Sequence, residues 1–162
     1  MKIIDIDVLK KEETLNLTQH PSSPEQVADG VVEPEDKEEV RELLTIDVST
    51  LLSSHSPDSF LWDRACRLAD CAAKSGHRTA MVGCMPALQP WLVEALFRAG
   101  VLPLFAVSDR VSQEQTLPDG SVKKVNIFKH LGWVPAHRRQ RVETVKDPVR
   151  PRQGPTVPLP TN

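Results

Sequence analysis

Three short polar segments of this 162-residue chain each follow an apolar run, and their residue types suit the binding of an anionic ligand. Gly83 would let a backbone amide approach a phosphate, and a helix N-terminus directly after it would add partial positive charge. Arg110 carries a forked cation that matches phosphate oxygens. Hydroxyl and amide side chains in the same segments offer neutral hydrogen bonds to a sugar or a base. The segments are Thr18-Gln19-His20, Gly83-Cys84-Met85 and Ser108-Asp109-Arg110.

Two of these residues can take part in bond making. His20 is the natural candidate for proton transfer, because an unperturbed imidazole titrates close to neutrality. Cys84 lies just before the expected helix N-terminus, which would lower its thiol pKa and suit a nucleophile. The sequence places no histidine beside it, however, so we rank a packing role in the loop first and a nucleophilic role second. Structural roles exist for the others too: Gly83 can permit close helix packing, and Arg110 can pair with a neighbouring carboxylate. Convergence of the segments on one edge favours a binding site.

The elements expected to hold these segments form a βαβ unit. Residues 80–83 read as a strand, a proline-opened helix follows Gly83-Cys84 directly, Gly100 stops that helix, and residues 104–108 form a second strand. Residues 14–20 alternate apolar and polar side chains and stop at Pro21, which predicts the first core strand. Because parallel strands end at the same edge of a sheet, the three segments should meet there as loops.

Other periodic segments complete an α/β fold. We predict a small Rossmann-like domain over residues 14–136, with a parallel sheet core, flanking helices and a C-terminal β-hairpin. The expected helices run from Pro24 to Gly30 after a capping box at Ser23, from near Pro34, and from Pro57 to Gly76. Residues 111–115 and 121–129 flank Asp119-Gly120 as a hairpin, and residues 131–135 add a last short strand.

The two ends of the chain differ from this domain. Residues 1–13 are expected to form an N-terminal extension or an edge strand. Residues 137–162 are basic, and five of the fourteen prolines lie within 148–162, so we expect a disordered tail. Residues 1–63 hold 5 Lys/Arg against 15 Asp/Glu, and residues 123–162 hold 9 against 2. Such asymmetry marks an anion-binding end less often than a solvated surface, so no duplex nucleic acid is expected.

Composition and missing motifs exclude several classes of protein. The three cysteines contain no C-x-x-C pair, so neither a disulfide framework nor a zinc site is expected, and we expect no cofactor or metal. No run approaches the length of a membrane span and no secretion signal is evident, which favours a cytoplasmic protein without a membrane partner. The sequence lacks G-x-G-x-x-G, G-x-x-x-x-G-K-[ST], H-E-x-x-H and G-x-S-x-G, which disfavours dinucleotide oxidoreductases, P-loop hydrolases, zinc proteases and α/β-hydrolases.

Taken together, four stretches resemble the small CRISPR-associated Rossmann-like proteins related to the CARF domain, a group that includes ring nucleases acting on cyclic oligoadenylate messengers. The likeness covers roughly residues 15–134. Its most specific part is the strand with Ser-Asp-Arg, the hairpin and the Phe-Lys-His ending. The stretches are residues 16–20 (NLTQH), 80–83 (AMVG), 100–110 (GVLPLFAVSDR) and 119–130 (DGSVKKVNIFKH).

The resemblance implies a homodimer that binds a cyclic oligoadenylate across its two-fold axis and cleaves it without a metal. A ribose 2′-hydroxyl would attack the adjacent phosphodiester, with the protein positioning the ring and stabilising charge. Arg110 and Lys129 suit the charge role, and His20 or His130 would assist the 2′-hydroxyl or the leaving oxygen. The ligand-positioning residues implied are Thr18, Gln19, Gly83, Cys84, Met85, Ser108 and Asp109.

Two other functions stay open. The turn Gly83-Cys84-Met85 departs from the more polar or doubly glycine turn of related chains, which would suit a sensor or sponge that binds a nucleotide without cleaving it. A third hypothesis is an interaction protein, of phage or mobile-element origin, that recruits a partner through its acidic helix or its proline-rich tail.

Overall fold

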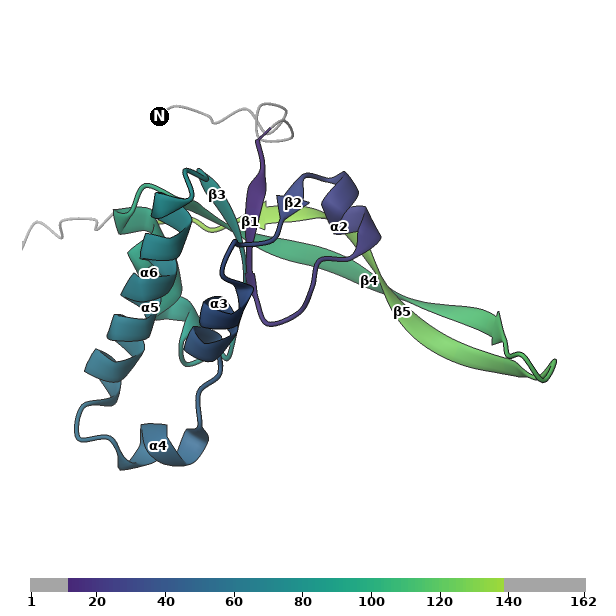
Figure 1. Ribbon diagram of the computed structural model, residues 1–162, viewed down its shortest axis with the longest axis horizontal. Coiled ribbons are helices and arrows are strands. Elements are labelled where there is room, and N and C mark those ends of the chain that lie inside the picture. Colours follow the sequence, from purple (N-terminus) through teal and green to yellow (C-terminus); the bar gives the residue numbers. More distant parts are fainter. Residues whose placement is uncertain (1–11, 139–162) are drawn as a thin grey trace, which may run out of the picture.

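The computed structural model describes residues 12–138, which fold around a five-stranded sheet (Figure 1). The strand order is β2-β1-β3-β4-β5, and every neighbouring pair is parallel except β4 with β5. The mixed α/β architecture with a mostly parallel sheet and a C-terminal hairpin confirms the predicted fold class. The strands are β1 (Thr14–Thr18), β2 (Val31–Val32), β3 (Thr79–Gly83), β4 (Leu102–Thr116) and β5 (Val122–Pro135).

Three of the five described helices begin at a residue whose side chain caps them. At α2 the Ser23 hydroxyl accepts a hydrogen bond from the Gln26 amide at 3.2 Å, while the Gln26 side chain accepts one from the Ser23 amide at 2.9 Å. This reciprocal pair is the predicted capping box. At α3, Asp36 accepts from the amide of Glu39. The helices are α2 (Pro24–Ala28), α3 (Lys37–Leu44), α4 (Val48–Ser53), α5 (Pro57–Lys74) and α6 (Gln89–Arg98).

The core lies between the sheet and one layer of helices. In this layer α5 packs on α6, and α3 packs on α5 and β1 (Figure 1). Leu15 and Leu17 of β1 are buried against Leu68 of α5 and Leu92 of α6. Each such leucine contributes about 2 kcal/mol by leaving water. Helix α2 lies apart from this layer and contacts β2 and β5 instead.

β4 and β5 extend far beyond the rest of the sheet. Only Leu102–Leu104 of β4 pair with β3, whereas β4 pairs with β5 from Leu104 to Thr116. We call residues 108–116 and 122–130 the arm, because this two-stranded ribbon projects away from the body of the molecule (Figure 1). A register shift between Val107 and Ser108 marks the start of the arm.

Three sequence predictions need correction. The loop expected at residues 108–110 does not form, because the first strand and the predicted hairpin are one continuous strand, β4. The helix after β3 begins at Gln89 rather than directly after Cys84, since residues 86–88 form a turn and Pro90 takes a first-turn position. β1 ends at Thr18, two residues before the expected His20.

Some predictions fall partly outside the described residues. Of the expected N-terminal extension, only Glu12 and Glu13 are described, and neither belongs to a strand. Of the expected tail over residues 137–162, only residues 137 and 138 are described. Within residues 12–138, no helix combines the length and the hydropathy that crossing a bilayer requires.

Candidate functional site

A crevice of about 540 Å³ opens at the carboxyl ends of β1 and β3. Thr18 and Gly83, the last residues of these strands, lie directly opposite each other in the register. From β1 the chain crosses to β2 on one side, whereas β3 lies on the other side of β1, so the connections diverge at this boundary. Open α/β sheets bind ligands at such a switch point. The lining is Thr18, Gln19, His20, Pro21, Gln26, Met81, Val82, Gly83, Cys84, Met85, Phe105 and Ala106.

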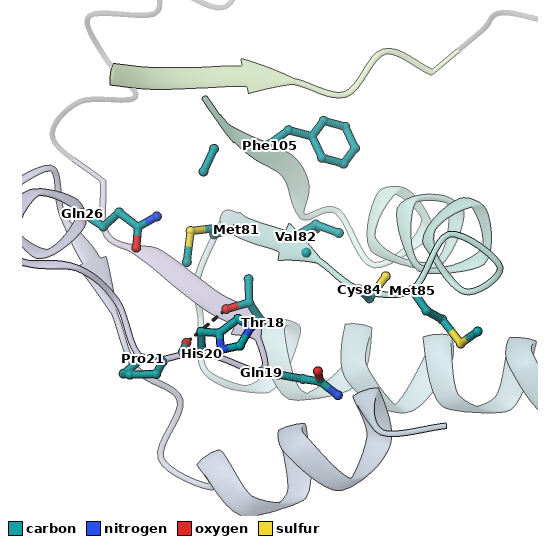
Figure 2. A pocket seen from close by; sticks show the side chains of 12 residues that line it. Thr18, Gln19, His20, Pro21, Gln26, Met81, Val82, Cys84, Met85 and Phe105 are labelled. Carbon is teal, nitrogen blue, oxygen red and sulfur yellow. Dashed lines mark hydrogen bonds between the residues drawn. The ribbon is translucent and has the colours of Figure 1, made fainter. Parts of the chain in front are cut away.

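The crevice has an apolar wall and a polar rim. Met81, Val82 and Phe105 supply the apolar side chains, with Met81 and Val82 on opposite sides of β3, and the loop after β1 supplies the exposed side chains of Gln19 and His20 (Figure 2). No lysine or arginine belongs to this lining. The crevice therefore suits a flat, largely uncharged ring with hydrogen-bonding edges better than a bare anion.

β1 and β3 approach each other closely at Gly83. A methyl group built on its Cα would lie 3.2 Å from Cγ2 of Thr18. Such a contact is tighter than packed carbon atoms normally allow, so a side chain here would force the Thr18 side chain to shift. This contact between two strands differs from both roles that the sequence suggested for Gly83, the approach of a phosphate and close helix packing.

A buried asparagine shapes the loop that forms the polar rim. Asn16 of β1 is fully buried, and its Oδ1 accepts hydrogen bonds from the amide and the hydroxyl of Thr18 at 2.9 and 2.7 Å. Its Nδ2 lies 2.9 Å from the carbonyl oxygen of His20 and 3.0 Å from Oγ of Ser22. Since a buried amide must find partners, this side chain fixes the path of residues 18–22.

An ion pair completes the support of this loop. Lys37 Nζ lies 2.7 Å from Glu33 Oε2 and donates to the Thr18 carbonyl at 3.0 Å. Glu33 Oε1 also accepts from the amide and the hydroxyl of Ser22, at 2.8 and 2.6 Å, and from Asn16 Nδ2 at 2.8 Å. Burial alone would raise the pKa of Glu33, but the hydrogen bonds from Lys37, Ser22 and Asn16 together lower it to about 2. Glu33 is therefore an anion at neutral pH.

Cys84 is not activated by its position. Burial raises the pKa of its thiol to about 11, so the reactive thiolate is scarce at neutral pH. This direction is opposite to the lowering that a helix N-terminus directly after Cys84 would produce, and α6 begins only at Gln89. Cys84 packs against the hydrophobic core instead, in agreement with the first of its two predicted roles.

The arm carries four of the predicted residues away from the crevice. Ser108, Asp109 and Arg110 lie inside β4, and Lys129 lies opposite Asp109 on β5. Ala106 is the last residue of β4 that lines the crevice. Arg110 comes four residues later, which is about 13 Å further along an extended strand. The structure thus brings together Thr18, Gln19, His20, Gly83, Cys84 and Met85, but places none of the arm residues in this lining.

His130 lies at the base of the arm in a contact with α2. Its side chain is 5% exposed, and its Nε2 is 3.3 Å from Oδ2 of Asp29, the residue that ends α2. The indole of Trp133 donates to the same oxygen at 2.7 Å, and the two rings pack with centroids 4.5 Å apart. Nδ1 of His130 is buried without a hydrogen-bond partner among the described residues. This arrangement joins β5 to α2.

Sequence reasoning missed the residues that reach the site across elements. Gln26, Met81 and Phe105 line the crevice, and Glu33 and Lys37 hold its loop. Asn16 had a usable signal, because an amide in the middle of an apolar strand needs buried partners. Glu33 had none, since its contact with Ser22 depends on how β2 pairs with β1.

The described residues contain no group of three or more His, Cys, Asp or Glu side chains that could hold a metal ion. Comparison with protein families shows that a model described as "Uncharacterized protein MJ1673 family" aligns with residues 12–134. No curated protein and no solved structure matches the chain. The matched range includes the crevice, the loop network and the arm.

Proposed function

The chain belongs to the MJ1673 family, and we propose that it binds a nucleotide in the crevice between β1 and β3. The observation that supports this proposal is the position of the crevice. It lies at the switch point of the sheet, where the strand ends at Thr18 and Gly83 meet and the loop after β1 adds a polar rim to an apolar lining. The cyclic oligoadenylates are the nucleotides to test first, because the sequence resembles proteins that act on them.

The lining offers a separate place for each part of a nucleotide. In this proposal a purine ring lies against the apolar part of the lining, where Phe105 is the one aromatic side chain. Gln26 uses its Oε1 in the capping box, which leaves its amide hydrogens to donate to a base or a ribose. We place the phosphate beside the backbone of Gly83, which belongs to the lining and carries no side chain of its own.

Binding without cleavage is the form of this function that the crevice favours. Stabilising the charge of a phosphodiester transition state needs fixed cations or donors, and the predicted cations Arg110 and Lys129 lie on the arm. A single subunit therefore lacks a cation in the crevice lining. This observation supports a nucleotide sensor or sponge.

Cleavage is the second candidate, and it depends on His20. A ribose 2′-hydroxyl would attack the adjacent phosphorus, the bond to the 5′ oxygen would break, and the products would be a 2′,3′-cyclic phosphate and a 5′-hydroxyl. The proton leaving the 2′-hydroxyl has to be accepted, and a proton has to reach the 5′ oxygen. His20 carries the one imidazole of the crevice lining, and imidazole is the side chain that most often accepts and donates protons in catalysis.

Binding and turnover can be separated in one set of experiments. Calorimetry with cyclic tri-, tetra- and hexa-adenylate measures binding, and chromatography after long incubation with a chelator measures cleavage. We expect saturable binding of one ring size. Intact rings would identify a sensor, products that disappear in His20→Ala would identify an enzyme, and neither binding nor products would refute the nucleotide proposal. His55→Ala is the matched control, since His55 is equally exposed and lies outside the crevice.

A further inference from the structure

The arm has one open edge on β4. Beyond Leu104, β4 pairs only with β5, so its other edge has no strand partner among residues 12–138. Residues 108–116 of this edge span about 30 Å, and they point away from the body of the molecule (Figure 1). Unpaired backbone groups along such an edge form a template for another strand.

The arm also exposes apolar side chains that the rest of the molecule does not cover. Val111 and Ile127 lie opposite each other on one face and are 37% and 41% exposed. Phe128 on the other face is 69% exposed. A two-stranded ribbon without further strands is only marginally stable in water. The arm therefore gains stability if another strand is added to it.

The outer edge of β5 is poorly suited to receive that strand from a second copy. β5 carries Lys123, Lys124 and Lys129, and it contains no acidic residue between Val122 and Pro135. Pairing of two β5 strands would bring like charges together without any compensating carboxylate. Lysines of this kind protect a sheet edge from association.

The edge of β4 is complementary to itself. A two-fold axis perpendicular to the ribbon makes β4 antiparallel to its copy, and residues facing each other must then lie on the same face of the sheet. With Ser112 on the axis, Arg110 of each copy lies opposite Glu114 of the other, and all three side chains point to one face. With Val111 or Gln113 on the axis, Arg110 would face an uncharged residue of the other copy. With Arg110 on the axis, the two arginines would face each other.

We propose that two copies of this chain associate through the β4 edges of their arms, with Ser112 on the two-fold axis. The arms then form a continuous four-stranded sheet, β5-β4-β4-β5, that carries two Arg110–Glu114 pairs. The contact is isologous and closes on itself, so it gives a dimer rather than a fibre. This inference goes beyond the nucleotide proposal and stands without it, because it uses no residue of the crevice.

Disulfide cross-linking tests the position of the axis. Opposed Cα atoms of antiparallel strands are about 4.5–5.5 Å apart, within the range that a disulfide spans. We expect Ser112→Cys to give a covalent dimer on mild oxidation. Asn126→Cys is the matched control: Ser112 and Asn126 share one hydrogen bond of 2.8 Å, but two copies of residue 126 would be three strand spacings, about 14 Å, apart. The wild-type chain gives the background from its three native cysteines.

Charge exchange tests the pairing itself. Light scattering of the wild type should give twice the 18.0 kDa of one chain. Arg110→Glu places carboxylates opposite each other twice and should weaken dimerisation at least tenfold. Adding Glu114→Arg together with Lys124→Glu should restore it, because Glu114 lies opposite Lys124 in its own arm and the two changes keep opposite charges there. Arg110 faces the neutral Phe128 within its own arm, so the single variant should keep the wild-type circular dichroism. A wild type that stays monomeric at every concentration, or equal cross-linking at positions 112 and 126, would overturn the proposal.

Discussion

At the scale of single residues, contacts of one or two atoms set the shape of the crevice. The Thr18 methyl group lies against Gly83 of the neighbouring strand, where a larger residue would crowd it. Asn16 holds the loop after β1 through its Oδ1, which accepts from Thr18, and its Nδ2, which donates to the His20 carbonyl. Glu33 and Lys37 then link this loop to β2 and α3. The crevice is thus built by residues that a ligand need not touch. Their effects can be measured without knowing the ligand.

The approach of β1 and β3 can be tested by filling the space at Gly83. We expect Gly83→Ala to lower the free energy of unfolding by about 1 kcal/mol, because the new methyl group crowds Thr18 Cγ2. Thr18→Ser removes that methyl group and keeps the hydroxyl that bonds Asn16. The double variant should therefore be more stable than Gly83→Ala alone in urea denaturation. If the double variant lost as much stability as the two single variants combined, Gly83 and Thr18 would not crowd each other as described.

Asn16 is the residue whose loss should cost most. Asn16→Ala leaves the Thr18 hydroxyl, the His20 carbonyl and Ser22 without their buried partner, so we expect a loss of about 3 kcal/mol in the free energy of unfolding. Asn16→Asp keeps the acceptor oxygen but replaces the donor amide with a carboxyl group beside Glu33. The loss in the free energy of unfolding should be smaller at acid pH, where this carboxyl group is protonated, than at neutral pH, where two carboxylates would face each other. Thermal unfolding at both pH values measures this difference. Equal losses for the two variants at both pH values would contradict it.

Glu33 gives the fold a stability that acid removes. Because its folded pKa, about 2, lies below the ordinary value of 4.5, its contacts stabilise the fold fully above pH 4.5, and this contribution disappears as the pH falls toward 2. Its side chain is 41% exposed, so screening limits the contribution to about 1 kcal/mol. We expect Glu33→Gln to be less stable than the wild type near neutral pH and equally stable in acid. Glu35→Gln, at an exposed position nearby, serves as the control for lost charge.

At the scale of elements, local signals predicted most of the fold. The Ser23–Gln26 capping box, the alanine stripe of α5 and the glycine after α6 are short-range patterns, and each one produced the expected element. The length of β4 was missed, because the polar Ser108-Asp109-Arg110 resembles a loop when read along the chain. In the structure it is the exposed strand of a ribbon, where polar residues cost nothing. For the same reason the third expected strand end, residues 108–110, does not reach the crevice, whereas the ends of β1 and β3 do.

The contact between α2 and β5 can be tested at its shared acceptor. Asp29→Asn should weaken the hydrogen bonds from Trp133 and His130, because a neutral amide is a poorer acceptor than a carboxylate. We expect faster amide hydrogen exchange in Pro24–Ala28 and in the second half of β5, with little change in α5. Asp58→Asn, on the exposed first turn of α5, is the matched control. Unchanged exchange in both segments would show that the Asp29 carboxylate does not hold them together.

At the scale of the whole molecule, the crevice and the arm have separate supports. The core beneath the crevice consists mainly of side chains from β1, β3, α3, α5 and α6, whereas the arm contributes no residue to this hydrophobic cluster and touches the body at its base through His130. We therefore expect the body to fold without the outer part of the arm. This separation could not be predicted from the sequence, because the pattern of residues 108–130 indicates strands but does not show whether those strands pack on the core or extend into solvent.

A shortened arm would separate the two parts. Val111 and Ile127 face each other across the ribbon, so residues 112–126 can be replaced by Asn-Gly, which favours a tight hairpin turn. We expect this variant to be monomeric, to unfold within a few degrees of the wild-type midpoint, and to keep any nucleotide affinity of the crevice. A large fall in the melting temperature would mean that the arm supports the body after all.

Asp29 links the base of the arm to the helix that borders the crevice. Through this carboxylate the ribbon base is bonded to the end of α2, and Gln26 in the same short helix lines the crevice. In the proposed dimer, a twist of either ribbon would reach α2 through this carboxylate and would shift Gln26 in the lining of the crevice on its own side. We therefore expect that a ligand in one crevice changes the affinity of the other, which would give cooperative binding isotherms.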